Sequence, residues 1–162
     1  MTDLAAVEVR VNGQPQQLEV RGSETLIETL RERLGVTSVR GTCGIGICGT
    51  CTVLVDGKIV SGCLTLSAGL DGSEIVTSEG LVEDGRLSRV QQAFVDAGAY
   101  QCSFCIPGFV LAVHERLSRD ARPSMEEMRH QLAGNLCRCG TYPEILDAVA
   151  ALIGTADEEE TT

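Results

Sequence analysis

The sequence predicts an α+β protein in which a small β-rich domain, residues 1–78, precedes an all-α domain of four helices, residues 85–154. Three observations favour this fold. Apolar and polar residues alternate in the first half, apolar residues recur at helical spacing in the second half, and eight cysteines divide into two sets of four, one per half. We expect residues 79–84 to be a linker and residues 155–162 to be an acidic disordered tail.

The β-rich half begins with a predicted hairpin, because VEVRV from Val7 and the later QQLEV alternate around a turn at Asn12-Gly13. Ser23 is expected to cap a helix that ends at Gly35. Its apolar positions at helical spacing are Leu26, Ile27, Leu30 and Leu34. A second hairpin, TVLV and KIV, turns at Asp56-Gly57, and Ile75-Val76 predicts a short fifth strand. One helix packed on a mixed sheet is the expected result.

The second half predicts four helices. Apolar residues at helical spacing indicate the first two helices. We expect Phe104 and Phe109 to pack in the core of this domain. Ser124 and Glu127 have capping-box spacing at the start of the third helix, and Thr141 and Glu144 repeat it before the fourth. The expected inner faces are Leu87, Val90, Phe94 and Val95; Phe109, Val110, Val113 and Leu117; and Ile145, Leu146, Val149 and Leu152.

Composition excludes several functions. The net charge of −10 argues against nucleic acid and against anionic membrane surfaces as partners. No apolar run approaches the roughly 18–20 residues that span a bilayer, and MTDLAAVEVR has no signal-peptide character, so we expect no membrane insertion and a cytoplasmic protein. Cytoplasmic thiols are kept reduced, which favours metal ligands over disulfides for the eight cysteines.

The first cysteine set lies in a glycine-rich loop, RGTCGIGICGTC, with its fourth member after the next hairpin. Its members are Cys43, Cys48, Cys51 and Cys63. The spacing C-x4-C-x2-C followed by a distant cysteine is that of plant-type [2Fe–2S] ferredoxins. Glycines let the backbone curl around a compact anion and aim its N–H groups inward. A structural zinc site is the alternative, although zinc favours C-x2-C pairs in both halves of a site.

The second cysteine set occurs in QCSFCIPG and NLCRCG, at the predicted ends of helices. Its members are Cys102, Cys105, Cys137 and Cys139. If these helix ends meet, four sulfurs converge where helix N-termini stabilise negative charge. The spacing C-x2-C and C-x-C favours an iron–sulfur cluster less decisively than the first set does, and zinc stays open.

Together these strings resemble the small iron–sulfur subunit of the xanthine dehydrogenase/aldehyde oxidase family of molybdenum hydroxylases. The resemblance covers about residues 5–154, and all eight cysteines match in order. It implies a plant-ferredoxin-like β-grasp domain and a four-helix domain, each with one [2Fe–2S] cluster. It further implies a large subunit with a molybdopterin cofactor, which hydroxylates substrate with oxygen from water, and in most members a medium subunit with FAD.

The resemblance also implies roles for single residues. The position of Gln101 contacts the pterin in the family, and that of Cys139 connects its cluster toward the pterin. Electrons then pass from the second cysteine set to the first, and on to FAD. Aldehydes, purines, other N-heterocycles and carbon monoxide are all substrates of the family's large subunits.

Two sequence departures leave the final acceptor open. The family's commonest ending, C-R-C-T-G-Y, is here Cys139-Gly140-Thr141-Tyr142, as in members that lack FAD and reduce cytochromes, whereas Ile106-Pro107-Gly108 is typical of the FAD-containing branch. Ser103 stands where glycine is frequent. No catalytic triad, P-loop or dinucleotide fingerprint occurs, so substrate chemistry is not expected in this chain.

Two other functions remain as alternatives. A free-standing ferredoxin would shuttle electrons between unrelated partners, but it would need only residues 1–78. A zinc-stabilised interaction module would have no redox role, and metal and sulfide content distinguishes it from an iron–sulfur protein.

Overall fold

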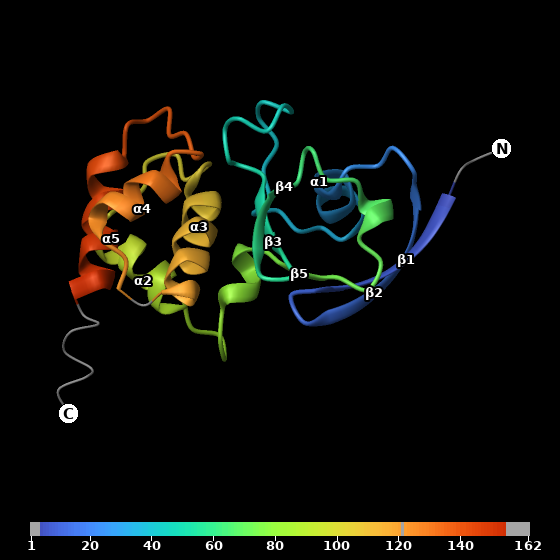
Figure 1. The fold of residues 1–162 in the computed structure, drawn as a ribbon, viewed down its shortest axis with the longest axis horizontal. Coiled ribbons are helices and arrows are strands. Elements are labelled where there is room, and N and C mark those ends of the chain that lie inside the picture. Colours follow the sequence, from blue (N-terminus) through green and yellow to red (C-terminus); the bar gives the residue numbers. More distant parts are fainter. Residues whose placement is uncertain (1–3, 121, 155–162) are drawn as a thin grey trace.

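A computed structural model describes residues 4–120 and 122–154, so the expected tail, residues 155–162, lies outside the described residues. A sheet with one short helix forms one side of the molecule and a group of helices forms the other (Figure 1). The strands are β1 (Leu4–Val11), β2 (Gln14–Arg21), β3 (Thr52–Val55), β4 (Lys58–Ser61) and β5 (Glu74–Val76). The α-helices are α1 (Leu26–Glu28), α2 (Arg89–Asp96), α3 (Ile106–Arg119), α4 (Met125–Leu132) and α5 (Tyr142–Gly154).

The five strands form one mixed sheet in the order β2-β1-β5-β3-β4, in which β1 and β5 are parallel and the other pairs are antiparallel. Both predicted hairpins are present. Asn12 and Gly13 have φ of 49° and 77°, and Asp56 and Gly57 have φ of 49° and 75°. Positive φ at both central residues is the requirement of a type I′ turn, whose twist matches that of the strands.

The predicted helix of the first half exists, but its start differs from the expectation. Thr25, not Ser23, occupies the capping position, and the Glu28 carboxylate accepts hydrogen bonds from the Thr25 N–H and hydroxyl at 2.7 Å each. After one α-helical turn the chain continues as a π-helical segment, Thr29–Arg33, and Gly35 follows with φ of 67°. The capping-box partner therefore decides the start of the helix more than the nearest serine does.

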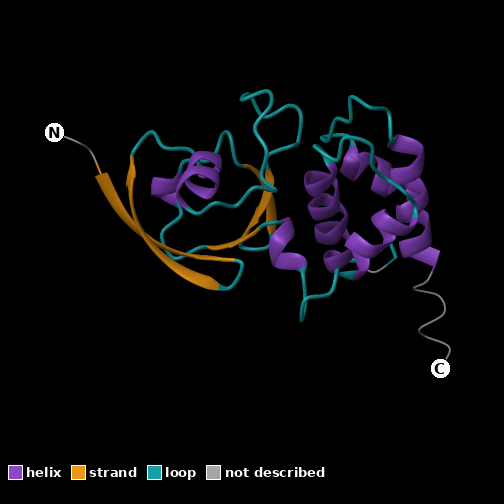
Figure 2. Ribbon diagram, turned by 180° about the vertical axis from the view of Figure 1, so that it is seen from behind, coloured by secondary structure: helices purple, strands orange, loops and turns teal. Residues whose placement is uncertain are grey.

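Two hydrophobic cores share strand β3. Val53 and Val55 pack with α1 and the sheet, whereas Leu54 points to the other face and joins the core of the helices. All four residues of β3 are buried. Figure 2 shows α3 beside the part of the sheet that contains β3. The helices thus cover a sheet face that would otherwise be exposed, which does not suit a ferredoxin made of residues 1–78 alone.

The second half contains α2 to α5, and its helix starts are well specified. Ser88 and Gln91 form a capping box for α2, and Ser124 and Glu127 form the predicted one for α4. Two predicted inner residues are wrong: Leu87 precedes α2, and both Leu87 and Val95 are exposed. None of the helices in the described part of the chain is both long enough and apolar enough to cross a bilayer.

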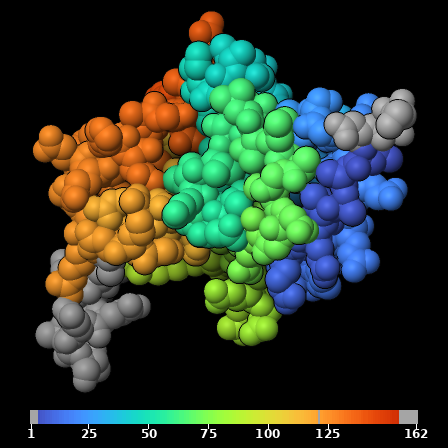
Figure 3. All heavy atoms as spheres, turned by 45° about the vertical axis from the view of Figure 1, so that its right-hand side comes forward, coloured from blue at the N-terminus to red at the C-terminus, as the bar shows by residue number. Residues whose placement is uncertain are grey.

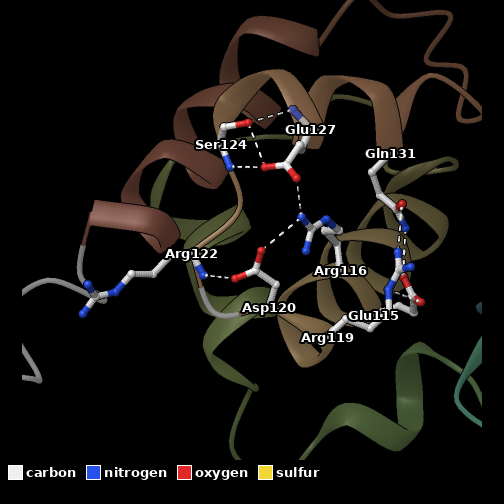
Figure 4. A network of polar contacts seen from close by, with 8 residues as sticks. All are labelled: Glu115, Arg116, Arg119, Asp120, Arg122, Ser124, Glu127 and Gln131. Carbon is white, nitrogen blue, oxygen red and sulfur yellow. Dashed lines mark hydrogen bonds and ion pairs between the residues drawn. The ribbon is translucent and has the colours of Figure 1, made fainter.

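A network of charged side chains joins the end of α3 to the start of α4 (Figure 4). The buried Glu115 accepts hydrogen bonds from Arg119 and from Gln131 Nε2, the latter at 2.9 Å. Arg116 pairs with Asp120 at 3.2 Å and with Glu127 at 3.0 Å. Because Glu115 is paired, its burial is tolerated. The network fixes α4 against α3 and so helps to place the loop after α4, which carries the last two cysteines.

Glu79 connects the predicted linker to the first half. It lies in the 3-10 turn η3 (Ser78–Leu81) and accepts hydrogen bonds from the Ser38 N–H at 2.9 Å, the Ser38 hydroxyl and the Thr77 hydroxyl. Burial alone would raise the pKa of Glu79, but these hydrogen bonds outweigh it and hold the pKa below its ordinary value of 4.5.

We therefore expect Glu79 to stabilise the fold above about pH 4.5 and to lose this effect as the pH falls through its lowered folded pKa. The Glu79→Gln variant should be less stable than the parent at neutral pH, and the difference should narrow below pH 4.5. Urea unfolding between pH 3 and 7 measures this, with the exposed Glu126→Gln as control. A difference in the free energy of unfolding between Glu79→Gln and the parent that stays constant across this pH range would contradict the prediction.

Candidate functional site

Both cysteine sets lie at the same end of the molecule, on loops that the two halves bring together (Figure 1). The first set occupies the loop before β3 and the turn after β4, and the second set occupies the segments before α3 and between α4 and α5. Figure 3 shows the first loop at this end of the molecule, next to the segment that follows α4. All eight cysteines are free thiols.

In the first cysteine set the side chains interact in two pairs, Cys43 with Cys48 and Cys51 with Cys63. Cys48 and Cys51 are buried, whereas Cys43 and Cys63 are partly exposed. The set therefore has an inner side toward the protein and an outer side toward solvent.

Backbone N–H groups surround the outer sulfur of the first pair. Hydrogen bonds from the N–H groups of Ile45, Cys48 and Ile47 lower the pKa of Cys43 to about 6. Gly44 and Gly46 have φ of 67° and 74°, which allows the loop to turn these groups inward. The predicted purpose of the glycines is thus visible in the geometry.

The second cysteine set also consists of two pairs. Cys102 and Cys139 have sulfurs 3.4 Å apart at the surface, and Cys105 contacts Cys137 in the interior. Burial raises the pKa of Cys105 to about 12. Burial also opposes ionisation of Cys137, but its contacts with the hydroxyl and backbone N–H of Thr141 outweigh this effect and lower the pKa to about 7.

The buried sides of the two sets meet through the backbone. The N–H of Leu136 donates to the carbonyl of Cys48 at 3.0 Å, and Leu136 directly precedes Cys137. Asn135 Nδ2 donates to the Gly49 carbonyl at 3.1 Å. A single hydrogen bond therefore links a residue of the first set to the neighbour of a residue of the second.

Arg40 makes a further contact between the halves. Its guanidinium donates to the Ser103 carbonyl at 2.8 Å and lies 5.1 Å from the centre of the Phe104 ring. Phe104 is 43% exposed, so the expectation that it packs in the core is wrong, whereas Phe109 is fully buried as predicted. The exposed ring is held at the surface by the arginine.

Ser103 has φ of 61°, which explains why glycine suits this position. We expect Ser103→Gly to change the free energy of unfolding by less than about 1 kcal/mol, because the relief of backbone strain is offset by greater entropy of the unfolded chain. Ser103→Val should destabilise by about 1–2 kcal/mol, since a β-branched residue is disfavoured in this region. Denaturant unfolding of both variants tests this, and equal stabilities would contradict it.

The arrangement in pairs bears on the choice of metal. Zinc needs four ligands around one ion, whereas each iron of a [2Fe–2S] cluster takes two protein ligands and two sulfides. The donor sets therefore fit two irons per set better than one zinc.

The comparisons with known proteins agree with this geometry. Residues 9–81, which contain the first set, match the model of a 2Fe-2S iron-sulfur cluster binding domain, and residues 77–150, which contain the second, match that of a [2Fe-2S] binding domain. The xanthine dehydrogenase iron-sulfur-binding subunit of Escherichia coli is 44% identical over 150 residues, covering 91% of this chain and 94% of that subunit. The chain belongs to the iron–sulfur subunits of the xanthine dehydrogenase/aldehyde oxidase family.

Two solved structures extend this result. One chain of quinoline 2-oxidoreductase from Pseudomonas putida has a TM-score of 0.89 and 35% identity, with 98% of this chain and 99% of that chain covered. The aldehyde oxidoreductase of Desulfovibrio desulfuricans has a TM-score of 0.89 and 34% identity, but the likeness covers 97% of this chain and only 18% of that one. This iron–sulfur subunit has a ferredoxin-like domain followed by a helical domain, and it is part of an oxidoreductase complex.

The structure brings together every predicted site residue of each set and adds contacts that sequence reasoning missed. Gln101 is exposed and its side chain donates to the Cys139 carbonyl at 3.2 Å, so both residues lie at one surface. Arg40, Asn135 and Leu136 were not predicted as site residues. In the sequence, Gly134-Asn135 indicates only the end of a helix, and no pattern indicates a contact of Arg40 or Leu136 with the other half.

Proposed function

We propose that this subunit relays electrons from a molybdopterin centre in a large subunit, through two [2Fe–2S] clusters, to a final acceptor. The observation that carries the proposal is the hydrogen bond between Leu136 and Cys48, which connects the buried sides of the two cysteine sets. Their other sides are open to partners. A chain that only bound zinc for stability would not need this alignment.

The eight cysteines are the proposed ligands, with one iron for each contacting pair. The pairs are Cys43 with Cys48, Cys51 with Cys63, Cys102 with Cys139, and Cys105 with Cys137. When bound, each cluster supplies one-electron redox chemistry. The protein holds the ligands in place, directs N–H groups at sulfur and keeps water from the inner pairs.

The proposed entry side consists of Gln101, Cys102 and Cys139. Gln101 and Cys102 are exposed, and Gln101 is held against Cys139 by its side-chain hydrogen bond. A cysteine pair at the surface, beside an amide that can make further hydrogen bonds as donor and acceptor, suits contact with a polar cofactor such as a pterin. The rest of the molybdopterin site then belongs to the large subunit.

The proposed exit side surrounds Cys43 and Cys63. Ile45, Ile47 and Leu64 are each at least 60% exposed there. Exposed apolar side chains beside a redox centre favour a protein partner that excludes water from it. A medium subunit with FAD is the proposed partner, and a cytochrome is the alternative acceptor.

The substrate class rests on relatives alone. The similar proteins belong to xanthine dehydrogenase, aldehyde oxidoreductase and quinoline 2-oxidoreductase. We therefore propose that the complex hydroxylates an aldehyde, a purine or another N-heterocycle. Its cytoplasmic location stays a prediction from the sequence.

Metal and sulfide analysis with anaerobic redox titration tests the proposal. We expect two iron and two acid-labile sulfides for each cysteine set, and two distinct [2Fe–2S] signals by electron paramagnetic resonance. A colourless protein with zinc and no sulfide would support the interaction module. Clusters in a chain that purifies with no large subunit would support the free-standing carrier.

A further inference from the structure

Thr141 has a buried hydroxyl whose contact in the described structure is a cysteine sulfur. The residue is 3% exposed, and its Oγ1 lies 2.9 Å from Cys137 Sγ. A hydroxyl oxygen that is so deeply buried needs a hydrogen-bond partner. Within residues 4–120 and 122–154, this hydroxyl makes no hydrogen bond other than the contact with Cys137. The position is also where this chain departs from the family's commonest order of residues.

The local chain is arranged to bring the hydroxyl to the sulfur. Gly140 has φ of 82°, so the chain reverses after Cys139 and returns Thr141 toward Cys137. The Thr141 carbonyl accepts the Ile145 N–H at 3.1 Å, as expected of a residue that begins α5. The predicted capping bond with Glu144 is wrong, because the hydroxyl is turned to the sulfur and Glu144 Oε2 has no hydrogen-bond partner among the described residues.

The direction of the hydrogen bond follows from the state of the sulfur. A cysteine that binds iron is a thiolate and has no proton, so the Thr141 hydroxyl must be the donor. Thr50 provides a contrast in the first set. Its Oγ1 lies 3.2 Å from Cys48 Sγ, but its proton is donated to the Arg40 carbonyl at 2.8 Å.

We propose that Thr141 is a positioning residue that raises the reduction potential of the second cluster by donating its hydroxyl hydrogen bond to Cys137 Sγ. The inference deepens the proposed function and rests on it, since it requires Cys137 to bind iron. Thr50 has no equivalent effect on the first cluster, because its hydroxyl proton is already engaged.

The physical reason is the charge of the cluster. Reduction adds one negative charge, which is partly carried by the ligand sulfurs, and a donor to sulfur stabilises the more negative state. Loss of the donor should therefore make the second cluster harder to reduce. Thr141 thereby helps that cluster to accept electrons from its donor.

The test uses the full chain with both clusters assembled and measures each potential by a redox titration followed by electron paramagnetic resonance. Thr141→Val removes the hydroxyl and keeps the size of the side chain. At a fixed potential, we expect the ratio of reduced to oxidised second cluster in this variant to be about tenfold lower than in the parent. For a one-electron couple, this corresponds to a reduction potential lowered by ~59 mV. The first cluster serves as an internal control and should not shift. Thr141→Ser, which keeps the hydroxyl, should restore the potential.

Several results would overturn the inference. One is an unchanged potential in Thr141→Val, or in Thr141→Ala should valine prevent cluster assembly. Another is a shift of the first cluster in Thr50→Val as large as that of the second in Thr141→Val, because any nearby hydroxyl would then act alike. Absence of a [2Fe–2S] cluster from the second set of the parent would instead refute the proposed function itself.

Discussion

Replacement of Cys139 by serine in the assembled enzyme is expected to slow reduction of both clusters by substrate at least tenfold, while molybdenum stays reducible. Loss of an outer-shell partner of a metal site already costs about 10–100-fold, and Cys139 is proposed as a direct ligand on the entry side. It belongs to the surface pair of the second set, 3.4 Å from Cys102, and its carbonyl holds Gln101. Stopped-flow absorbance of the clusters after mixing with substrate measures the effect.

Cys63→Ser provides the matched comparison, because it changes the same kind of residue in the first cysteine set, on the proposed exit side. Cys63 contacts Cys51 in the first set and is partly exposed. This variant should damage the first cluster and transfer to the final acceptor, while substrate still reduces the second cluster. Normal reduction of both clusters in Cys139→Ser would remove its proposed role. A loss confined to the second cluster in Cys63→Ser would contradict the grouping of the cysteines.

The sequence predicted those parts of the fold whose physics is local. Asn-Gly and Asp-Gly identify both hairpins because few residues adopt the positive φ of type I′ turns. Cysteine spacing identified the first set, since a ligand loop around a compact cluster restricts the number of residues between sulfurs. The capping box of Ser124 and Glu127 was predicted correctly because it too depends on a fixed spacing of two residues in the sequence.

The wrong predictions concern choices between similar local alternatives. Ser23 and Thr25 are both good caps, and only Thr25 has a glutamate three residues later. Leu87 and Val95 fit the apolar face of a helix, but Leu87 lies before the helix begins. Thr141 and Glu144 have the spacing of a capping box, yet the sulfur of Cys137, four residues before Thr141, competes for the hydroxyl.

The contact between the two cysteine sets was outside the reach of sequence patterns. Apart from the Asn135 amide, it is made by backbone groups of Cys48, Gly49 and Leu136, and backbone groups are the same in every residue. Periodicity, charge and spacing describe side chains only. The alignment that carries the proposed function therefore became visible only with the fold.

Gly108→Ala should disturb this alignment most directly. A Cβ at Gly108 would lie 2.3 Å from the Gly49 carbonyl oxygen and 3.2 Å from Asn135 Nδ2. The first contact is with backbone, which cannot rotate away, so α3 must separate from the first loop. Alanine in a helix normally gains about 1 kcal/mol over glycine, but overpacking costs about 1–3 kcal/mol and here also threatens the Asn135 hydrogen bond.

We therefore expect Gly108→Ala to lower the free energy of unfolding by about 1–3 kcal/mol in urea titrations and to weaken the magnetic interaction between the reduced clusters. Gly134→Ala is the matched control: it lies in the same interface, but a Cβ there meets no atom within 4 Å. Its stability and cluster interaction should match those of the parent. Equal behaviour of the two variants would mean that the close approach of Gly108 to Gly49 does not hold the two halves in register, and the Leu136–Cys48 connection would then need another cause.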